Sequence, residues 1–218
     1  MGIRGFFWKV SDFLQVANPK PFNIVAGKDG KLYEVRDHTL GRLVTHKKDI
    51  RELEDIKPGF QFNLPKIPGE LLETALSFFR YFVENSPEEQ EVMVQIFWDN
   101  EDEKYIIECP YQKVSKTRIF VEDYPILHNQ RFTQVMQIHS HNTMNAFFSS
   151  IDERDEKAFM VYGVVGRLDS HEPEILVRVG CNGEFIELPL DYIFNNPTIT
   201  LTNTHYPNEW NERVKPIR

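Results

Sequence analysis

One stretch, residues 135–152, constrains more than any other how this chain can fold. It opens with an apolar run, residues 135–138, that predicts a β-strand leading into His139 and His141. Because alternate side chains of a strand lie on the same face, the two histidines are expected to point the same way. Asp152 follows at a distance that allows the chain to turn and bring its carboxylate back to the histidines. The fold must therefore contain a strand that ends beside a chain reversal.

Two neighbouring imidazoles form half of a tetrahedral metal site, which a carboxylate and a water molecule would complete. Ser149 places a hydroxyl on the same turn, three residues before Asp152. A bare His-x-His pattern arises by chance in roughly one such chain in five, but the four-residue pattern in roughly one in 2,000. The pattern therefore predicts a catalytic type of metal site, with three protein ligands and one position open to water.

Such a site has chemical needs beyond its ligands. Zinc lowers the pKa of bound water from about 15.7 to about 7, which makes hydroxide available at neutral pH. A general base must take the proton of the water and return it to the leaving amine, and a donor must stabilise the oxyanion. The spacing of Ser149 from Asp152 favours Ser149 as that donor. The base is expected to be a glutamate on a strand edge that faces the histidine pair.

The pattern resembles the signature of the JAMM metalloproteases, also called the JAB, MPN or Mov34 family. That signature is an upstream Glu, then His-x-His, seven further residues and Ser-x-x-Asp, and this chain matches the last four positions without insertion or deletion. The resemblance implies that His139, His141 and Asp152 bind one Zn²⁺ per chain and that Ser149 supports the oxyanion. It implies a metallopeptidase or isopeptidase, a hydrolase of amide bonds.

The family's glutamate follows an N-terminal helix and stands at the start of the first hairpin strand. Glu91 occupies that place here, directly before the apolar run at residues 92–98. Glu88 and Glu89 lie close enough to remain rivals. By resemblance, Glu91 is the predicted general base.

The predicted fold class is α+β, with a mixed β-sheet flanked by helices in an α/β/α-like arrangement. Residues 1–66 predict a small β-rich unit, residues 67–194 the JAMM-like domain and residues 195–218 a polar tail that is either draped over the domain or mobile. Within the first segment, Asp29-Gly30 between two apolar runs predicts a hairpin. After Pro68, apolar residues at helical spacing predict a helix.

Two departures from the family stand out. The family usually has proline directly after the second histidine, and this chain has Asn142. Because proline there stiffens the loop but binds no metal, we expect the site to be kept. The additional Cys/His zinc site of some eukaryotic deubiquitinating members is missing. The pattern looks more like the bacterial, plasmid or phage branch, whose members sometimes occur beside ubiquitin-like proteins. The predicted partner is therefore a protein or peptide, with a ubiquitin-like one as a candidate. The alternative is a catalytically silent MPN-fold module that binds or scaffolds a partner.

The composition limits the classes of protein to which this chain could belong. A formal net charge of −8 argues against a nucleic-acid-binding protein. No apolar run approaches the ~20 residues of a membrane helix, so no membrane partner is predicted and the expected location is the cytoplasm. Cys109 and Cys181 lie far apart without a Cys-x-x-Cys motif, and we expect both to be reduced. The sequence predicts no oligomeric state.

Overall fold

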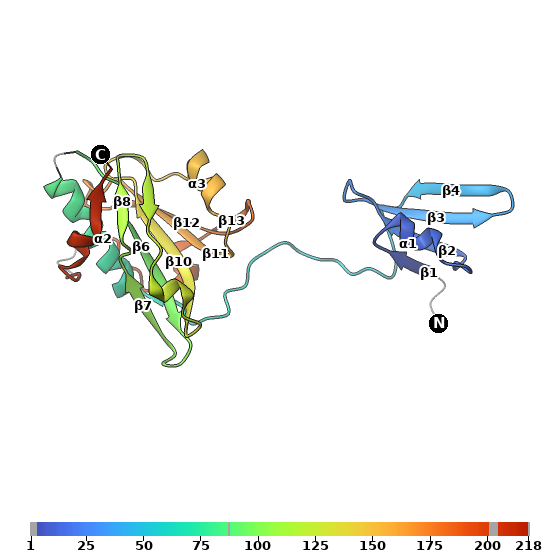
Figure 1. The fold of residues 1–218 in the computed structure, drawn as a ribbon, viewed down its shortest axis with the longest axis horizontal. Coiled ribbons are helices and arrows are strands. Elements are labelled where there is room, and N and C mark those ends of the chain that lie inside the picture. Colours follow the sequence, from blue (N-terminus) through green and yellow to red (C-terminus); the bar gives the residue numbers. More distant parts are fainter. Residues whose placement is uncertain (1–3, 87, 201–204, 218) are drawn as a thin grey trace. The chain divides into compact units, whose positions relative to one another are not determined.

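The computed structural model describes residues 4–86, 88–200 and 205–217. The chain divides into two compact units, Met1–Pro58 and Gly59–Arg218, and its structure is mixed α+β as predicted (Figure 1). The boundary thus precedes the one predicted after residue 66. Phe60, Phe62 and Leu64 pack against the core of the second unit, which is why the segment before Pro65 belongs to it.

The first unit is a four-stranded sheet with one short helix. Its elements are β1 (Arg4–Phe7), α1 (Val10–Leu14), β2 (Phe22–Ala26), β3 (Leu32–His38) and β4 (Gly41–His46), with the strands in the order β1-β2-β3-β4. The predicted hairpin is confirmed, because β2 and β3 pair antiparallel and Gly30 takes a φ of 75° in the turn. Phe13 of α1 packs on Val25 and Val35 and forms a small core.

The main sheet of the second unit has six strands in the order β13-β12-β11-β10-β6-β7. These strands are β6 (Met93–Asp99), β7 (Lys104–Glu108), β10 (Phe132–Ser140), β11 (Met160–Gly166), β12 (Glu174–Cys181) and β13 (Glu184–Leu188). β10 and β11 pair in parallel and the other neighbours pair antiparallel. The parallel pair brings the C-terminal ends of β10 and β11 together, and the histidines lie at that end.

Helix α2 (Gly69–Asn85) supplies one face of the core. Of the residues predicted from their spacing, Val83 is only partly buried, and the others are buried in the core: Leu72, Ala75, Leu76, Phe79 and Phe82. The helix begins directly after Pro68, so the predicted helix is confirmed. A short parallel pair between β5 (Ile67–Pro68) and β14 (Phe194–Asn195) ties its start to the end of α4 (Leu190–Ile193).

The C-terminal segment is part of the second unit and not a loose tail. α5 (Trp210–Arg213) leads into β15 (Val214–Pro216), which pairs in parallel with β8 (Gln112–Val114), and β8 pairs antiparallel with β9 (Ile119–Val121). Trp210 is 2% exposed and stands edge-on to Phe78, with ring centroids 5.3 Å apart. Burial of this aromatic surface fixes the segment. Residues 201–204 and 218, also in the predicted tail, lie outside the described residues.

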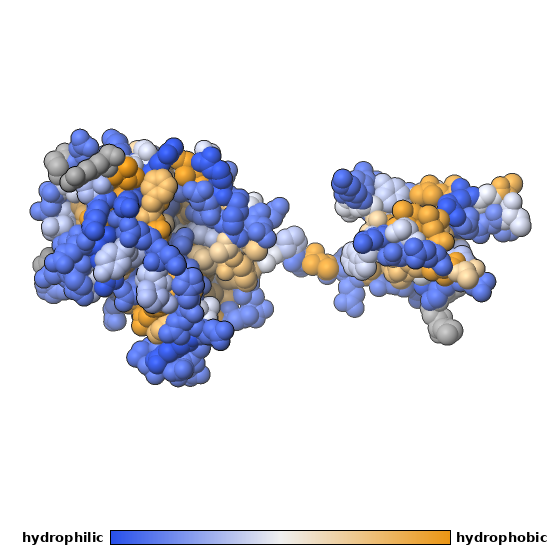
Figure 2. Space-filling model, in the orientation of Figure 1, coloured by the Kyte–Doolittle hydropathy of each residue, from blue (hydrophilic) through white to orange (hydrophobic). Residues whose placement is uncertain are grey.

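Two short helices before and after β10 complete the second unit. They are the 3₁₀ helix η1 (Pro125–His128) and helix α3 (Ser150–Asp155). Figure 2 shows that the visible surface of the second unit is mainly hydrophilic, as expected when the large aliphatic and aromatic side chains fill its core. Among the helices that the structure describes, none combines the length and apolar character needed to span a bilayer.

Candidate metal centre

The two histidines stand at the end of β10, where the sheet positions both imidazoles. His139 pairs with Met93 of β6 on one side and with Val164 of β11 on the other. His141 lies just past the strand, and its N–H donates to the carbonyl of Val165 at 2.7 Å. The side chains are buried, with 7% of His139 and 3% of His141 exposed. Neighbouring strands on both sides thus fix the direction of the pair.

His139 Nε2 lies at distances from the other two donor atoms that suit a tetrahedral metal. His139 Nε2 lies 3.3 Å from His141 Nε2 and 3.5 Å from Asp152 Oδ1. Ligands placed tetrahedrally about 2.0–2.1 Å from zinc are about 3.3–3.4 Å apart. The three donor atoms all lie within 4.8 Å of one another. The structure therefore brings His139, His141 and Asp152 together, and two nitrogens with one carboxylate oxygen are donors that zinc accepts.

Asp152 is held in place by the start of α3. Ser149 is the N-cap, and its side chain accepts hydrogen bonds from the backbone N–H groups of Ile151 and Asp152. In return, Asp152 Oδ2 accepts from the backbone N–H of Ser149 at 2.6 Å and from its hydroxyl at 2.7 Å. This capping box engages Oδ2 and leaves Oδ1 directed at His139.

Ser149 therefore has a task that the spacing alone had not assigned to it. A hydroxyl has one proton to donate, and here that proton goes to Asp152 Oδ2. The hydroxyl could stabilise an oxyanion only after rotating away from Asp152. In this conformation Ser149 orients a ligand.

Among the three rival glutamates, Glu91 is the one that faces the histidines. Its Oε1 lies 3.7 Å from His141 Nε2 and its side chain is 8% exposed. Glu89 instead hydrogen-bonds Thr143 and pairs with Lys116, and Glu88 is exposed. Burial, reinforced by the charge of Asp152, raises the pKa of Glu91 to about 8. A carboxyl group with such a pKa can both hold and release a proton near neutrality.

Burial has the opposite effect on the pKa values of the two histidines. Desolvation lowers the pKa of His139 and of His141, while the charge of Asp152 opposes both changes. Both imidazoles are thereby kept neutral at pH 7. A neutral imidazole has a free lone pair on one nitrogen, which is the form that binds a metal.

A cavity of about 110 Å³ opens beside His139 and Asp152. Its wall includes Glu91, His139 and Asp152 and also residues 117–119, which lead into β9. Arg118 contributes an exposed guanidinium to this wall. The cavity gives a small ligand access to His139 and Asp152.

The backbone explains why this chain lacks the proline that usually follows the second histidine in the family. Asn142 has a φ of 51°, in the left-handed region that asparagine tolerates. Proline is locked near −65° and cannot adopt this conformation. Asn142 is fully buried, and its side-chain amide has no hydrogen-bond partner among the described residues.

Sequence reasoning overlooked Arg178 and Glu156. Arg178 lies on β12, is 5% exposed and forms a hydrogen-bonded ion pair with Glu156, which lines the cavity. The sequence contains one sign of Arg178, because this residue is the single cation inside the apolar run Ile175–Val179. Lone charges in buried strands are rare unless they are paired.

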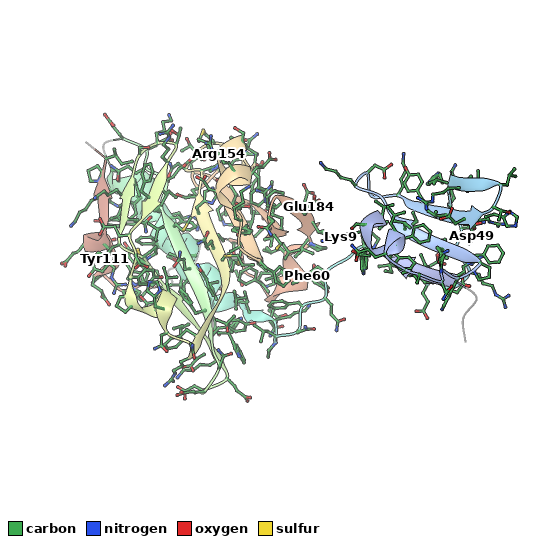
Figure 3. All side chains as sticks on the ribbon, turned by 45° about the vertical axis from the view of Figure 1, so that its right-hand side comes forward. Lys9, Asp49, Phe60, Tyr111, Arg154 and Glu184 are labelled. Carbon is green, nitrogen blue, oxygen red and sulfur yellow. The ribbon has the colours of Figure 1, made fainter. Side chains whose placement is uncertain are left out.

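The position of α3 can be followed in Figure 3 by Arg154, a residue of this helix whose side chain is exposed.

Comparison of the chain with models of protein families and with curated proteins finds no match. The resemblance to the JAMM family therefore rests on the motif residues alone.

Proposed function

We propose that the second unit is a JAMM-type zinc metallopeptidase or isopeptidase. The observation that carries this proposal is the cluster of three donor atoms, in which His139 Nε2 lies at distances that suit tetrahedral zinc from His141 Nε2 and from Asp152 Oδ1. Glu91 beside them adds a buried carboxyl group. Three ligands, an adjoining cavity and a base are the components of a hydrolytic zinc site.

A bound zinc ion would act as a Lewis acid and would lower the pKa of water at the open position. Glu91 would take the proton of the attacking water and deliver it to the leaving amine. Ser149 would hold Asp152 through the capping box and, after rotation of its hydroxyl, could donate to the oxyanion.

The proposed substrate is an amide bond in a protein or peptide. A ubiquitin-like partner is supported only by the resemblance to the family. The cavity fits this substrate class in one respect, because it is bordered by the edge strand β9 and is small. An extended segment, and not a folded domain, would have to reach the histidines.

Zinc content tests the metal site directly. Elemental analysis of the purified full chain should find one zinc per chain, and His139→Ala should lose it. His128→Ala is the matched control, because His128 is exposed and pairs with Asp123 away from the site. A wild-type chain that contains no zinc and gains none on dialysis would favour the alternative, a catalytically silent binding module.

Hydrolysis tests the base. The probes are ubiquitin with a C-terminal aminomethylcoumarin and a defined mixture of peptides analysed by mass spectrometry. Glu91→Gln should keep its zinc and lose about 10²–10⁴-fold in rate. Glu89→Gln serves as the control, because Glu89 faces Thr143 and Lys116 and not the histidines. Wild-type rates in the Glu91 variant would exclude this residue as the base.

A further inference from the structure

The helix that bears Asp152 contributes no fully buried side chain to the core. Helix α3 has six residues, and none of them is buried. Isolated helices of this length are unstable in water, and the capping box stabilises only its first turn. Yet Asp152 must stay within a few tenths of an ångström of one position to bind a metal with the histidines. Something outside the helix must hold it.

Arg178 contacts both ends of this segment. Its guanidinium lies over the ring of Phe148, with 3.7 Å from its central carbon to the ring centroid. Its Nε and Nη2 donate to Glu156 Oε2 at 2.9 and 2.6 Å. Phe148 directly precedes Ser149, and Glu156 directly follows α3. One side chain of β12 thus contacts the residue before the capping box and the residue after the helix.

Arg178 is itself rigidly held. The ring of Phe185, on β13, lies 3.7 Å from its central carbon, so that two aromatic rings pack against the guanidinium. β12 and β13 pair in register, with Arg178 opposite Glu187. A buried cation is costly unless it is paired and stacked, and Arg178 has both kinds of contact. Burial raises the pKa of Glu156 to about 7, whereas Arg178 acts to lower it.

We infer that Arg178 is a positioning residue for the metal centre, which holds residues 148–156 on β12 so that Asp152 stays directed at His139. This inference rests on the proposed function. It also explains why arginine is present, since lysine has neither the planar face that stacks on Phe148 nor the fork that binds Glu156. Partners of this kind, which orient metal ligands, commonly contribute 10- to 100-fold to metal affinity.

The test compares Arg178→Lys with Arg131→Lys in the full chain. Arg131 makes a similar two-point pair with Asp99, but it precedes β10 at the end opposite to His139, about 26 Å away along the strand. Phe148→Leu is a second variant, which keeps the Arg178–Glu156 pair and removes only the stacked ring. Thermal unfolding shows whether each variant is folded.

Two readouts are needed. The first is metal affinity, measured with Zn²⁺ against a chromophoric chelator, together with the visible spectrum of the Co²⁺-loaded protein. Arg178→Lys should bind zinc about 10- to 100-fold more weakly with an altered cobalt spectrum, Phe148→Leu should show a smaller loss, and Arg131→Lys should match the wild type. The second is amide hydrogen exchange of residues 148–156 in metal-free protein. Exchange there should be faster in Arg178→Lys and Phe148→Leu than in the control.

Wild-type affinity, cobalt spectrum and exchange in a folded Arg178→Lys would overturn the inference. If Arg178→Lys does not fold, Phe148→Leu decides by the same readouts, and unchanged values in it would also refute the role. A wild-type chain that binds no metal would refute the proposed function and the metal-centre role with it. The exchange experiment would then still show whether Arg178 holds the segment, so the two failures are distinguishable.

Discussion

The substitution Glu91→Gln should change how the stability of the metal-free protein depends on pH. Glu91 keeps its proton in the folded state up to about pH 8, whereas an unfolded chain releases it near the ordinary value of 4.5. Its contribution to stability is fully present below pH 4.5 and is lost as the pH rises to about 8. Each pH unit corresponds to about 1.36 kcal/mol, so the loss between pH 5 and pH 8 reaches about 4 kcal/mol. Glutamine carries no charge at any pH and avoids this loss.

The assay is urea unfolding of wild-type and Glu91→Gln protein at pH 5, 6, 7 and 8 with EDTA present. Tryptophan fluorescence reports on the second unit through Trp98 and Trp210, because Trp8 in the first unit is 87% exposed. The free energy of unfolding of the variant, minus that of the wild type, should rise by about 4 kcal/mol across this range. The histidines are present in both proteins, so their contribution to the pH dependence cancels in the difference between the two free energies of unfolding. A flat difference curve would refute the reasoning, since it would mean that Glu91 is not buried beside Asp152.

Three further outcomes are expected. Ser149→Ala removes the capping box and should lower the free energy of unfolding by about 1 kcal/mol in urea titrations, with weaker zinc binding in chelator competition. A zinc affinity equal to that of the wild type would show that the N-cap does not support the metal site. Zinc at 100 times its Kd should stabilise the second unit by about 2.7 kcal/mol in the same unfolding assay, EDTA should reverse the effect, and Asp152→Ala should show none of it. Asn142→Pro should lower the midpoint of thermal unfolding well below that of Asn142→Gly, because the φ of 51° admits glycine and excludes proline; similar midpoints would contradict this backbone explanation.

Much of the fold follows from local patterns in the chain. The helical spacing from Leu72 to Phe82 predicts α2 because an apolar stripe must be buried, and the structure buries it. Asp29-Gly30 predicts the first hairpin because glycine accepts a positive φ. The start of α3 is likewise local, because the serine N-cap and the acid three residues later satisfy each other's backbone groups. These features depend only on residues that are near in sequence.

The sequence by itself also determined which side chains could bind a metal, but it favoured Glu91 over Glu88 and Glu89 only through the resemblance to the family. That choice depends on which carboxyl group the sheet buries against His141, and so on the register of β6 with β10. The packing of Trp210 on Phe78 likewise joins residues that are distant in sequence, as does the contact of Arg178 with both ends of the α3 segment. Tertiary structure decided these points, because burial and long-range pairing exist only once the strands have been assembled.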